Sequence, residues 1–108
     1  MDWFGAVRHI TSNGMAVRNI RHRGLRRLWE RNDHRGVPAQ SADKLTRMMA
    51  ALNRTSAPEK LAALPGWRLH RLAGDRAGFW SLTVTGNWRL IFRFERGDAL
   101  DLDLVDYH

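Results

Sequence analysis

The stretch Phe79–His108, FWSLTVTGNWRLIFRFERGDALDLDLVDYH, decides the fold of the chain. Apolar and polar residues alternate within it over residues 79–84, 87–94 and 99–105, which is the period of strands with one buried face. The intervening TGN and ERGD are typical turn sequences. Strands joined by such tight turns predict an antiparallel meander with one face toward a core.

Two upstream segments extend the predicted sheet: the alternating run WRLHRL at residues 67–72 and a short edge strand within residues 16–20. Alternation assigns each side chain to a face. The predicted core face carries Trp67, Leu69, Trp88, Leu90, Phe92, Phe94, Leu100, Leu102 and Leu104. The predicted open face carries Arg68, His70, Arg89, Arg93, Asp101 and Asp103.

The segments before the strands have helical spacing. Leu25, Leu28 and Trp29 share one side of a helix predicted from Gly24 to about Asn32, with arginines on its other side. Residues 41–54, SADKLTRMMAALNR, predict a second helix with Ser41 as N-cap and Ala42, Leu45, Met48, Met49 and Leu52 toward the core. The predicted class is α+β, with two N-terminal helices packed on one face of a mainly antiparallel, four- to five-stranded sheet.

Length and composition limit the organisation to one domain of 108 residues. We expect residues 17–108 to form it and residues 1–16, which show no period, to be a flexible arm or an over-extended start, with Met15 as the alternative first residue. No apolar run approaches the roughly 18 residues of a membrane-spanning helix, and no secretory signal is evident. The absence of cysteine excludes disulfides and thiolate metal sites, and fits a reducing cytoplasm.

The charge favours a polyanionic partner. Eighteen Lys and Arg oppose eleven Asp and Glu, giving a net charge of +7. Most of the basic residues are arginine, whose planar fork suits phosphates, although a GC-rich genome would give the same bias. The excess is uneven, because the charged residues from Glu95 onward are five acidic residues and only Arg96. There Asp101 and Asp103 are better explained by cross-strand ion pairs than by metal binding.

Two of the five histidines stand out: His70 within a strand and His108 at the end of the last one. RNA cleavage through the 2′-hydroxyl needs a base, an acid and a cation at the phosphate. Histidine can serve either proton transfer, each worth roughly 10²–10⁴-fold, and arginine suits the charge of the transition state. A nucleic-acid-binding face without chemistry explains the same residues equally well.

Four segments together resemble the HigB branch of the RelE superfamily of bacterial toxins. These are RHRGLRRLWE, GVPAQSADKL, GDRAGFWSLTVTGNWRLIFRF and the terminal DYH, and the resemblance runs from about Val17 to His108. It implies a RelE-like fold and a ribosome-dependent endoribonuclease that cuts mRNA in the decoding site. It also implies a type II toxin–antitoxin module with a helix-turn-helix, HigA-like antitoxin, which alone would contact operator DNA. Cytoplasmic action without cofactor, metal or membrane goes with it.

The resemblance also implies the site residues. His70 and His108 would share the two proton transfers, with acid and base undecided, and Arg89 would hold the scissile phosphate. Tyr107 would orient the nucleotide and Asp106 would fix His108. Ala73 replaces a lysine frequent in the family, so Arg71 or Arg76 would have to substitute. We expect RNA contacts from Arg68, Arg71, Arg76 and Arg93 and, for ribosomal RNA, from Arg23, Arg26 and Arg27.

Two other functions are compatible with this fold. One is a same-fold toxin with another target, such as gyrase, although such relatives lack a matching terminal histidine. The other is a non-catalytic RNA-binding module. Removal of His108 would distinguish them from a nuclease.

Overall fold

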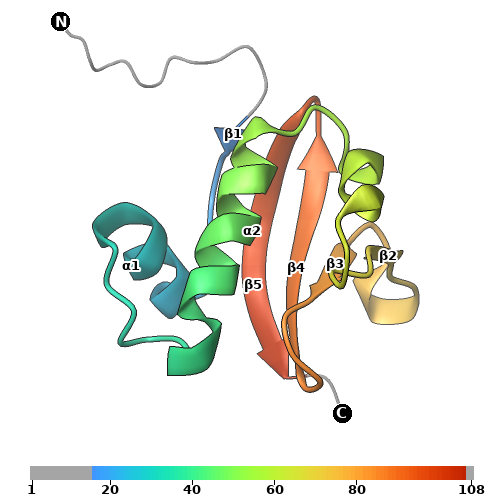
Figure 1. Ribbon diagram of the computed structural model, residues 1–108. Helices are drawn as coiled ribbons and strands as arrows, with labels where there is room; N and C mark the ends of the chain where they lie inside the picture. The colour runs from blue at the N-terminus through green and yellow to red at the C-terminus, as the bar shows by residue number, and fades with distance from the viewer. Residues whose placement is uncertain (1–15, 107–108) are drawn as a thin grey trace, which may run out of the picture.

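A computed structural model describes residues 16–106 of the chain (Figure 1). Most of the predicted N-terminal arm, together with Tyr107 and His108, therefore lies outside the described residues. The described part is a single five-stranded sheet with helices against one face, which confirms the predicted α+β class.

The sheet has the strand order β1-β5-β4-β3-β2. Strands β2 to β5 form the predicted antiparallel meander, and β1 pairs in parallel with β5 at the opposite edge. The bounds of the strands are Ala16–Val17 (β1), His70–Arg71 (β2), Trp80–Thr83 (β3), Trp88–Glu95 (β4) and Asp98–Asp106 (β5). The sheet is thus mainly antiparallel, as the sequence pattern predicts.

Two α-helices precede the meander: α1 at Arg23–Arg31 and α2 at Ala42–Arg54. His22 caps the N-terminus of α1, and its imidazole Nδ1 accepts a hydrogen bond from the backbone N–H of Leu25 at 3.1 Å. Asn32 caps the C-terminus in the left-handed conformation, with φ of 56°. Short 3₁₀ turns occupy Ala39–Ser41 (η1), Pro58–Ala63 (η2) and Gly74–Arg76 (η3). Ser41 stands at the N-cap position of α2, but its side chain makes no capping hydrogen bond.

The core lies between α2 and the sheet, with α1 beside β1 (Figure 1). Both predicted helices supply it, and Met48 and Met49 are fully buried there as predicted. Trp67 and Leu69 pack partly buried against it, which confirms their predicted face. The remaining fully buried apolar residues are Leu25, Leu45, Leu52, Leu82, Leu90, Phe92, Ala99 and Leu102.

Strand β5 contains a bulge that the alternating leucines conceal. Ile91 pairs with Asp103, but Arg93 pairs with Leu100, so β5 holds one more residue than β4 in this interval. Asp101 provides it in a left-handed conformation, with φ of 53°. Leu100 therefore lies on the face of Arg93, away from Leu102 and Leu104, and the prediction that it joins them was wrong. It is buried but outside the main core cluster.

Strand β2 is shorter than its sequence pattern predicts. Only His70–Arg71 pair with β3, because Arg68 has a φ of 49°, which interrupts an extended backbone. β1 is also short, although Ile20 makes an isolated parallel bridge to Leu102 farther along.

The start of α1 packs against the loop that follows the same helix, and the two backbones are so close that no side chain fits between them. A Cβ on Gly24 would overlap the carbonyl oxygen of Gly36, and a Cβ on Gly36 would lie 2.7 Å from the Cα of Gly24. These two glycines let the two backbone segments touch.

Candidate active site

The sheet face opposite the main core brings two of the predicted site residues together. Paired residues of neighbouring strands share a face, so the register places His70 beside Ser81 and Arg89 beside Thr83 on this open face. With strands about 4.8 Å apart and a rise of about 3.3 Å per residue, the Cα atoms of His70 and Arg89 are roughly 12 Å apart. At this distance the two side chains do not contact each other, but they can contact one substrate from two sides.

Arg89 is a half-buried side chain at the start of β4, and the preceding turn holds its guanidinium. Its Nη1 donates to the carbonyl oxygen of Thr85 at 2.8 Å, of Trp88 at 3.2 Å and of Gly86 at 3.3 Å. The family resemblance implies that Arg89 binds the phosphate. The structure shows in addition that the turn fixes the orientation of its guanidinium.

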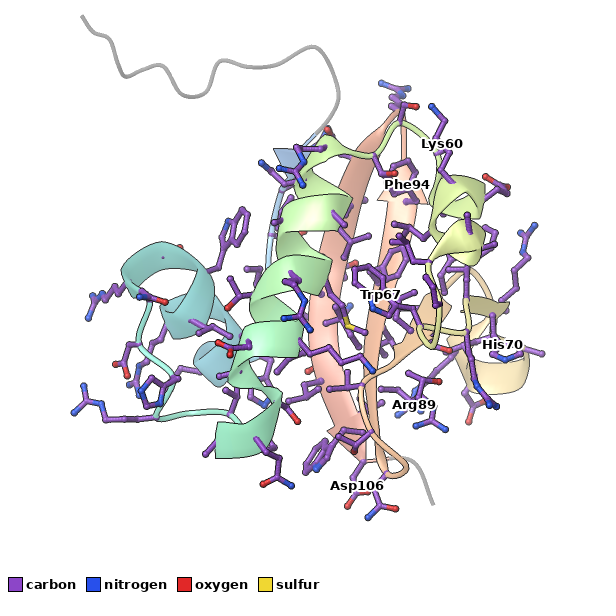
Figure 2. The ribbon with its side chains drawn as sticks, in the orientation of Figure 1. Lys60, Trp67, His70, Arg89, Phe94 and Asp106 are labelled. Carbon is purple, nitrogen blue, oxygen red and sulfur yellow. The ribbon has the colours of Figure 1, made fainter. Side chains whose placement is uncertain are left out.

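The end of β5 reaches the same end of the sheet as Arg89. Asp106, the last described residue, is exposed and pairs with Trp88, the neighbour of Arg89. Figure 2 shows Arg89 and Asp106 at this end, with His70 at the β2 edge. The chain therefore enters Tyr107 and His108 from a point next to Arg89, and these two predicted site residues lie outside the described range.

Arg93, a predicted RNA ligand on the same face, is surrounded by carboxylates. It forms ion pairs with Asp101 at 3.1 Å and with Glu95. Asp101 also lies 3.6 Å from Arg21, whose guanidinium lies over the ring of Phe79 at 5.7 Å. The expected cross-strand ion pair thus exists for Asp101.

The side chain of Asn19 contributes most to lowering the pKa of the Asp101 carboxyl, by donating a 2.9 Å hydrogen bond, and Arg93 and Arg21 lower it further against the effect of burial. In return, the backbone N–H of Asp101 donates to the amide oxygen of Asn19 at 3.0 Å. Asp103 makes no comparable ion pair within the described chain, and its Oδ1 accepts the backbone N–H of Leu104 at 2.9 Å.

Comparison with known proteins identifies the family. Residues 18–108 match the family of the RelE-like toxin of the type II toxin–antitoxin system HigB. The chain belongs to the HigB family of toxins. It is 39% identical over 92 residues to "Endoribonuclease HigB" of Proteus vulgaris, covering 85% of this chain and 99% of that protein. It is 34% identical over 68 residues to "Toxin HigB-1" of Vibrio cholerae serotype O1 (strain ATCC 39315 / El Tor Inaba N16961), covering 63% of this chain and 72% of that protein.

Three further arginines of this HigB-family toxin lie near the β2 edge, and they are not equivalent. Arg71 pairs with Trp80 on the core side of the sheet, with its guanidinium 4.9 Å from the centre of the indole ring. Arg76 ends the 3₁₀ turn that follows Ala73 and is exposed, as is Arg68. Arg71 thus lies on the face away from His70, and Arg76 lies in the connection between β2 and β3.

The basic residues of α1 form a second surface, separate from the open face. Arg23 and Arg27 are exposed and Arg26 is half-buried. They line a shallow hollow of about 370 Å³ together with Glu30 and Arg31. Figure 1 shows α1 beyond the β1 edge, across the sheet from β2, so these arginines are not brought together with His70.

Sequence reasoning missed three residues that organise these surfaces: His22, Asn19 and Thr85. His22 caps α1, Asn19 bonds to Asp101, and the Thr85 hydroxyl accepts backbone N–H groups within the turn before Arg89. Only the turn sequence TGN carried a signal for any of them. Among residues 16–106, no three His, Asp or Glu side chains are grouped to hold a metal ion, and no helix is long and apolar enough to span a bilayer.

Proposed function

We propose that this protein is the toxin of a type II toxin–antitoxin module and an endoribonuclease that cuts mRNA in the ribosomal decoding site. Its action in the cytoplasm would inhibit translation and arrest growth. Membership of the HigB family and the endoribonuclease named among its relatives support this proposal. The observation that carries it is the open face, where His70 and Arg89 flank the end of the sheet at which β5 leads into Tyr107 and His108.

The proposed reaction uses the RNA's own 2′-hydroxyl and needs no metal. One histidine removes the proton from that hydroxyl, the oxygen attacks the adjacent phosphorus, and the bond to the 5′-oxygen breaks. The other histidine protonates the leaving 5′-oxygen. We assign these two roles to His70 and His108, and the roughly 12 Å between the Cα atoms of His70 and Arg89 leaves room for one phosphodiester between those two side chains.

Arg89 stabilises the charge that develops on the phosphate. Its guanidinium is oriented before substrate binds, which is the condition under which such stabilisation is most effective. Asp106 orients His108, and Tyr107 orients the nucleotide. Arg76 supplies the positive charge that the family lysine would otherwise provide.

A second basic surface fits ribosome dependence. Arg23, Arg26 and Arg27 on α1 contact ribosomal RNA phosphates, while the open face receives the mRNA. Like charges spaced four residues apart on a helix destabilise it, so an anionic partner would relieve a cost that the free protein bears. A HigA-like helix-turn-helix antitoxin neutralises the toxin and provides the contact with operator DNA.

The test compares His108→Ala, His70→Ala and His34→Ala, the last altering an exposed loop histidine as control. On translating ribosomes carrying a defined mRNA, we expect the first two to cleave at least roughly 100-fold more slowly than wild type. His34→Ala should cleave at the wild-type rate. Of the three variants, it alone should still arrest growth on induction, as wild type does.

Each part of the proposal has its own contrary result. Undiminished cleavage by His108→Ala would show that the catalytic assignment is wrong. Cleavage of naked RNA as fast as ribosome-bound mRNA would refute ribosome dependence. Growth arrest without any RNA cleavage by wild type would indicate another target.

A further inference from the structure

The turn between β3 and β4 is closed by one hydroxyl group. The Oγ1 of Thr85 accepts the backbone N–H of Trp88 at 3.2 Å and that of Asn87 at 3.4 Å. The carbonyl oxygen of Trp88 accepts the N–H groups of Val84 and Thr85 at 2.9 and 3.3 Å. The hydroxyl thus ties the far side of the turn to its first residue.

The same turn presents its carbonyl oxygens to Arg89. The Nη1 group carries two hydrogens, which are shared among the carbonyls of Thr85, Gly86 and Trp88. A guanidinium is planar, so an anchored Nη1 and a half-buried stem together set the direction of its other edge, formed by Nε and Nη2. That edge is the fork that matches two phosphate oxygens.

We propose that Thr85 is a positioning residue for Arg89: its hydroxyl orders the turn carbonyls, and these aim the guanidinium at the scissile phosphate. The kinetic consequence rests on the proposed function, but the coupling between Thr85 and Arg89 does not. Thr85 is not among the predicted site residues and need not touch substrate.

The chemistry explains why both side chains are needed. Valine has the shape of threonine but cannot accept the two N–H groups, so Thr85→Val leaves these donors without their partner and loosens the turn. Lysine at position 89 would keep the charge, but a single ammonium cannot bind the turn and also present a two-pronged edge.

The first test measures kcat and KM for mRNA cleavage on ribosomes by Thr85→Val, Thr85→Ser and the control Thr46→Val. Thr46 is an exposed threonine of α2 whose Oγ1 donates to the carbonyl of Ala42 at 2.9 Å, so its valine variant loses one hydrogen bond away from the site. We expect Thr85→Val to lose roughly 10- to 100-fold in kcat with little change in KM, because a misaimed group slows the chemical step. Thr85→Ser should recover, and Thr46→Val should match wild type.

The second test does not depend on activity. In ¹⁵N NMR spectra of arginine side chains, wild type should show slow rotation of the Arg89 Nη1 group, and Thr85→Val and Thr85→Ala should show fast rotation. Thermal unfolding shows which variants fold. If Thr85→Val does not fold, Thr85→Ala takes its place in both tests.

Unchanged kcat in folded Thr85→Val, a change in KM alone, or unchanged Arg89 signals would overturn the inference. Absence of RNA cleavage by wild type would instead refute the proposed function. The NMR comparison would then still decide whether Thr85 controls Arg89.

Discussion

At the scale of single residues, Asp101 joins three parts of the chain. Its carboxylate contacts Asn19 and Arg21 beside the β1 edge and Arg93 on β4, while its left-handed backbone makes the bulge of β5. Its side chain is only 17% exposed, so these contacts are less screened than those of a surface ion pair. Asp101 therefore stabilises the fold through its ionised form.

We expect Asp101→Asn to lower the free energy of unfolding by roughly 1 kcal/mol at neutral pH. Asparagine tolerates the left-handed conformation, so the bulge should persist. The folded-state pKa of Asp101 lies below the ordinary value of an aspartate carboxyl, so its stabilisation is present above that ordinary value and is lost as the pH falls through the folded pKa. In urea titrations, wild type and variant should differ at pH 6 and converge in strong acid.

Asn19→Ala provides the complementary measurement. It removes the largest cause of the lowered pKa, so the loss of stability in acid should be smaller than in wild type and should be complete at a higher pH. If Asp101→Asn remains less stable by the same amount at every pH, ionisation is not the source of the effect.

At the scale of elements, two opposing effects act on Gly24 in α1: the preference of helices for alanine and the close contact with the backbone of Gly36. Alanine is favoured over glycine within a helix by about 1 kcal/mol. At Gly24, however, the added Cβ would overlap the backbone oxygen of Gly36, and overpacking typically costs about 1–3 kcal/mol. The neighbour is backbone rather than a flexible side chain, so the steric cost should exceed the gain.

We therefore expect Gly24→Ala to lower the free energy of unfolding by about 1–2 kcal/mol, measured by chemical denaturation. Gly86→Ala is the matched control, because a Cβ there has open space within 4 Å. The control should stay within about 1 kcal/mol of wild type. A stabilised Gly24→Ala would mean that the loop at Gly36 moves away without cost.

The strands show what pattern can and cannot predict. Alternation located β3, β4 and β5 and the core faces of Leu90 and Leu102, because burial of one face requires that period. It failed at Leu100, since the backbone of Asp101 adds a residue without interrupting the leucine repeat. It also overestimated β2, because nothing in WRLHRL reveals the left-handed Arg68.

The candidate site was predictable only in part for the same reason. His70 and Arg89 share a face, as alternation predicts, and the family resemblance supplied their proposed roles. The contacts of Arg89 with the turn depend on three-dimensional carbonyl positions that no local pattern specifies. Alternation also places Arg71 on the face opposite His70, and its pairing with Trp80 agrees with that, while the choice between Arg71 and Arg76 as the substitute for the lysine stays a prediction.

At the scale of the whole molecule, the fold separates its charges. The acidic strand β5 receives arginines from its neighbours, with Arg18 on Asp98 and Arg21 and Arg93 on Asp101. The excess of positive charge that gives the net charge of +7 therefore lies mostly on surfaces away from β5, including the arginines of α1. Because the basic helix α1 is distant from the candidate site, it favours a second contact with an anionic partner, separate from the contact with mRNA.

The double variant Arg23→Gln/Arg27→Gln should weaken association with ribosomes and reduce its dependence on salt. Each lost phosphate contact should lower the slope of log affinity against log salt by about 1. Arg47→Gln/Arg54→Gln removes the same charge from exposed positions of α2 and should change the slope much less. Equal effects of the two pairs in sedimentation assays would indicate a response to net charge alone.

The bulge at Asp101 also shields the chain end from changes in length upstream. Leu102 and Leu104 are held in the core, so β5 beyond the bulge keeps its phase relative to β4. A residue gained or lost in the ERGD turn or at the bulge would shift Asp98–Leu100 instead, at the expense of the ion pair between Arg18 and Asp98. Insertions and deletions there should consequently reduce stability while the pairing of Trp88 with Asp106 stays in register, so this end of the hairpin can absorb a change in length without moving Asp106 relative to Arg89.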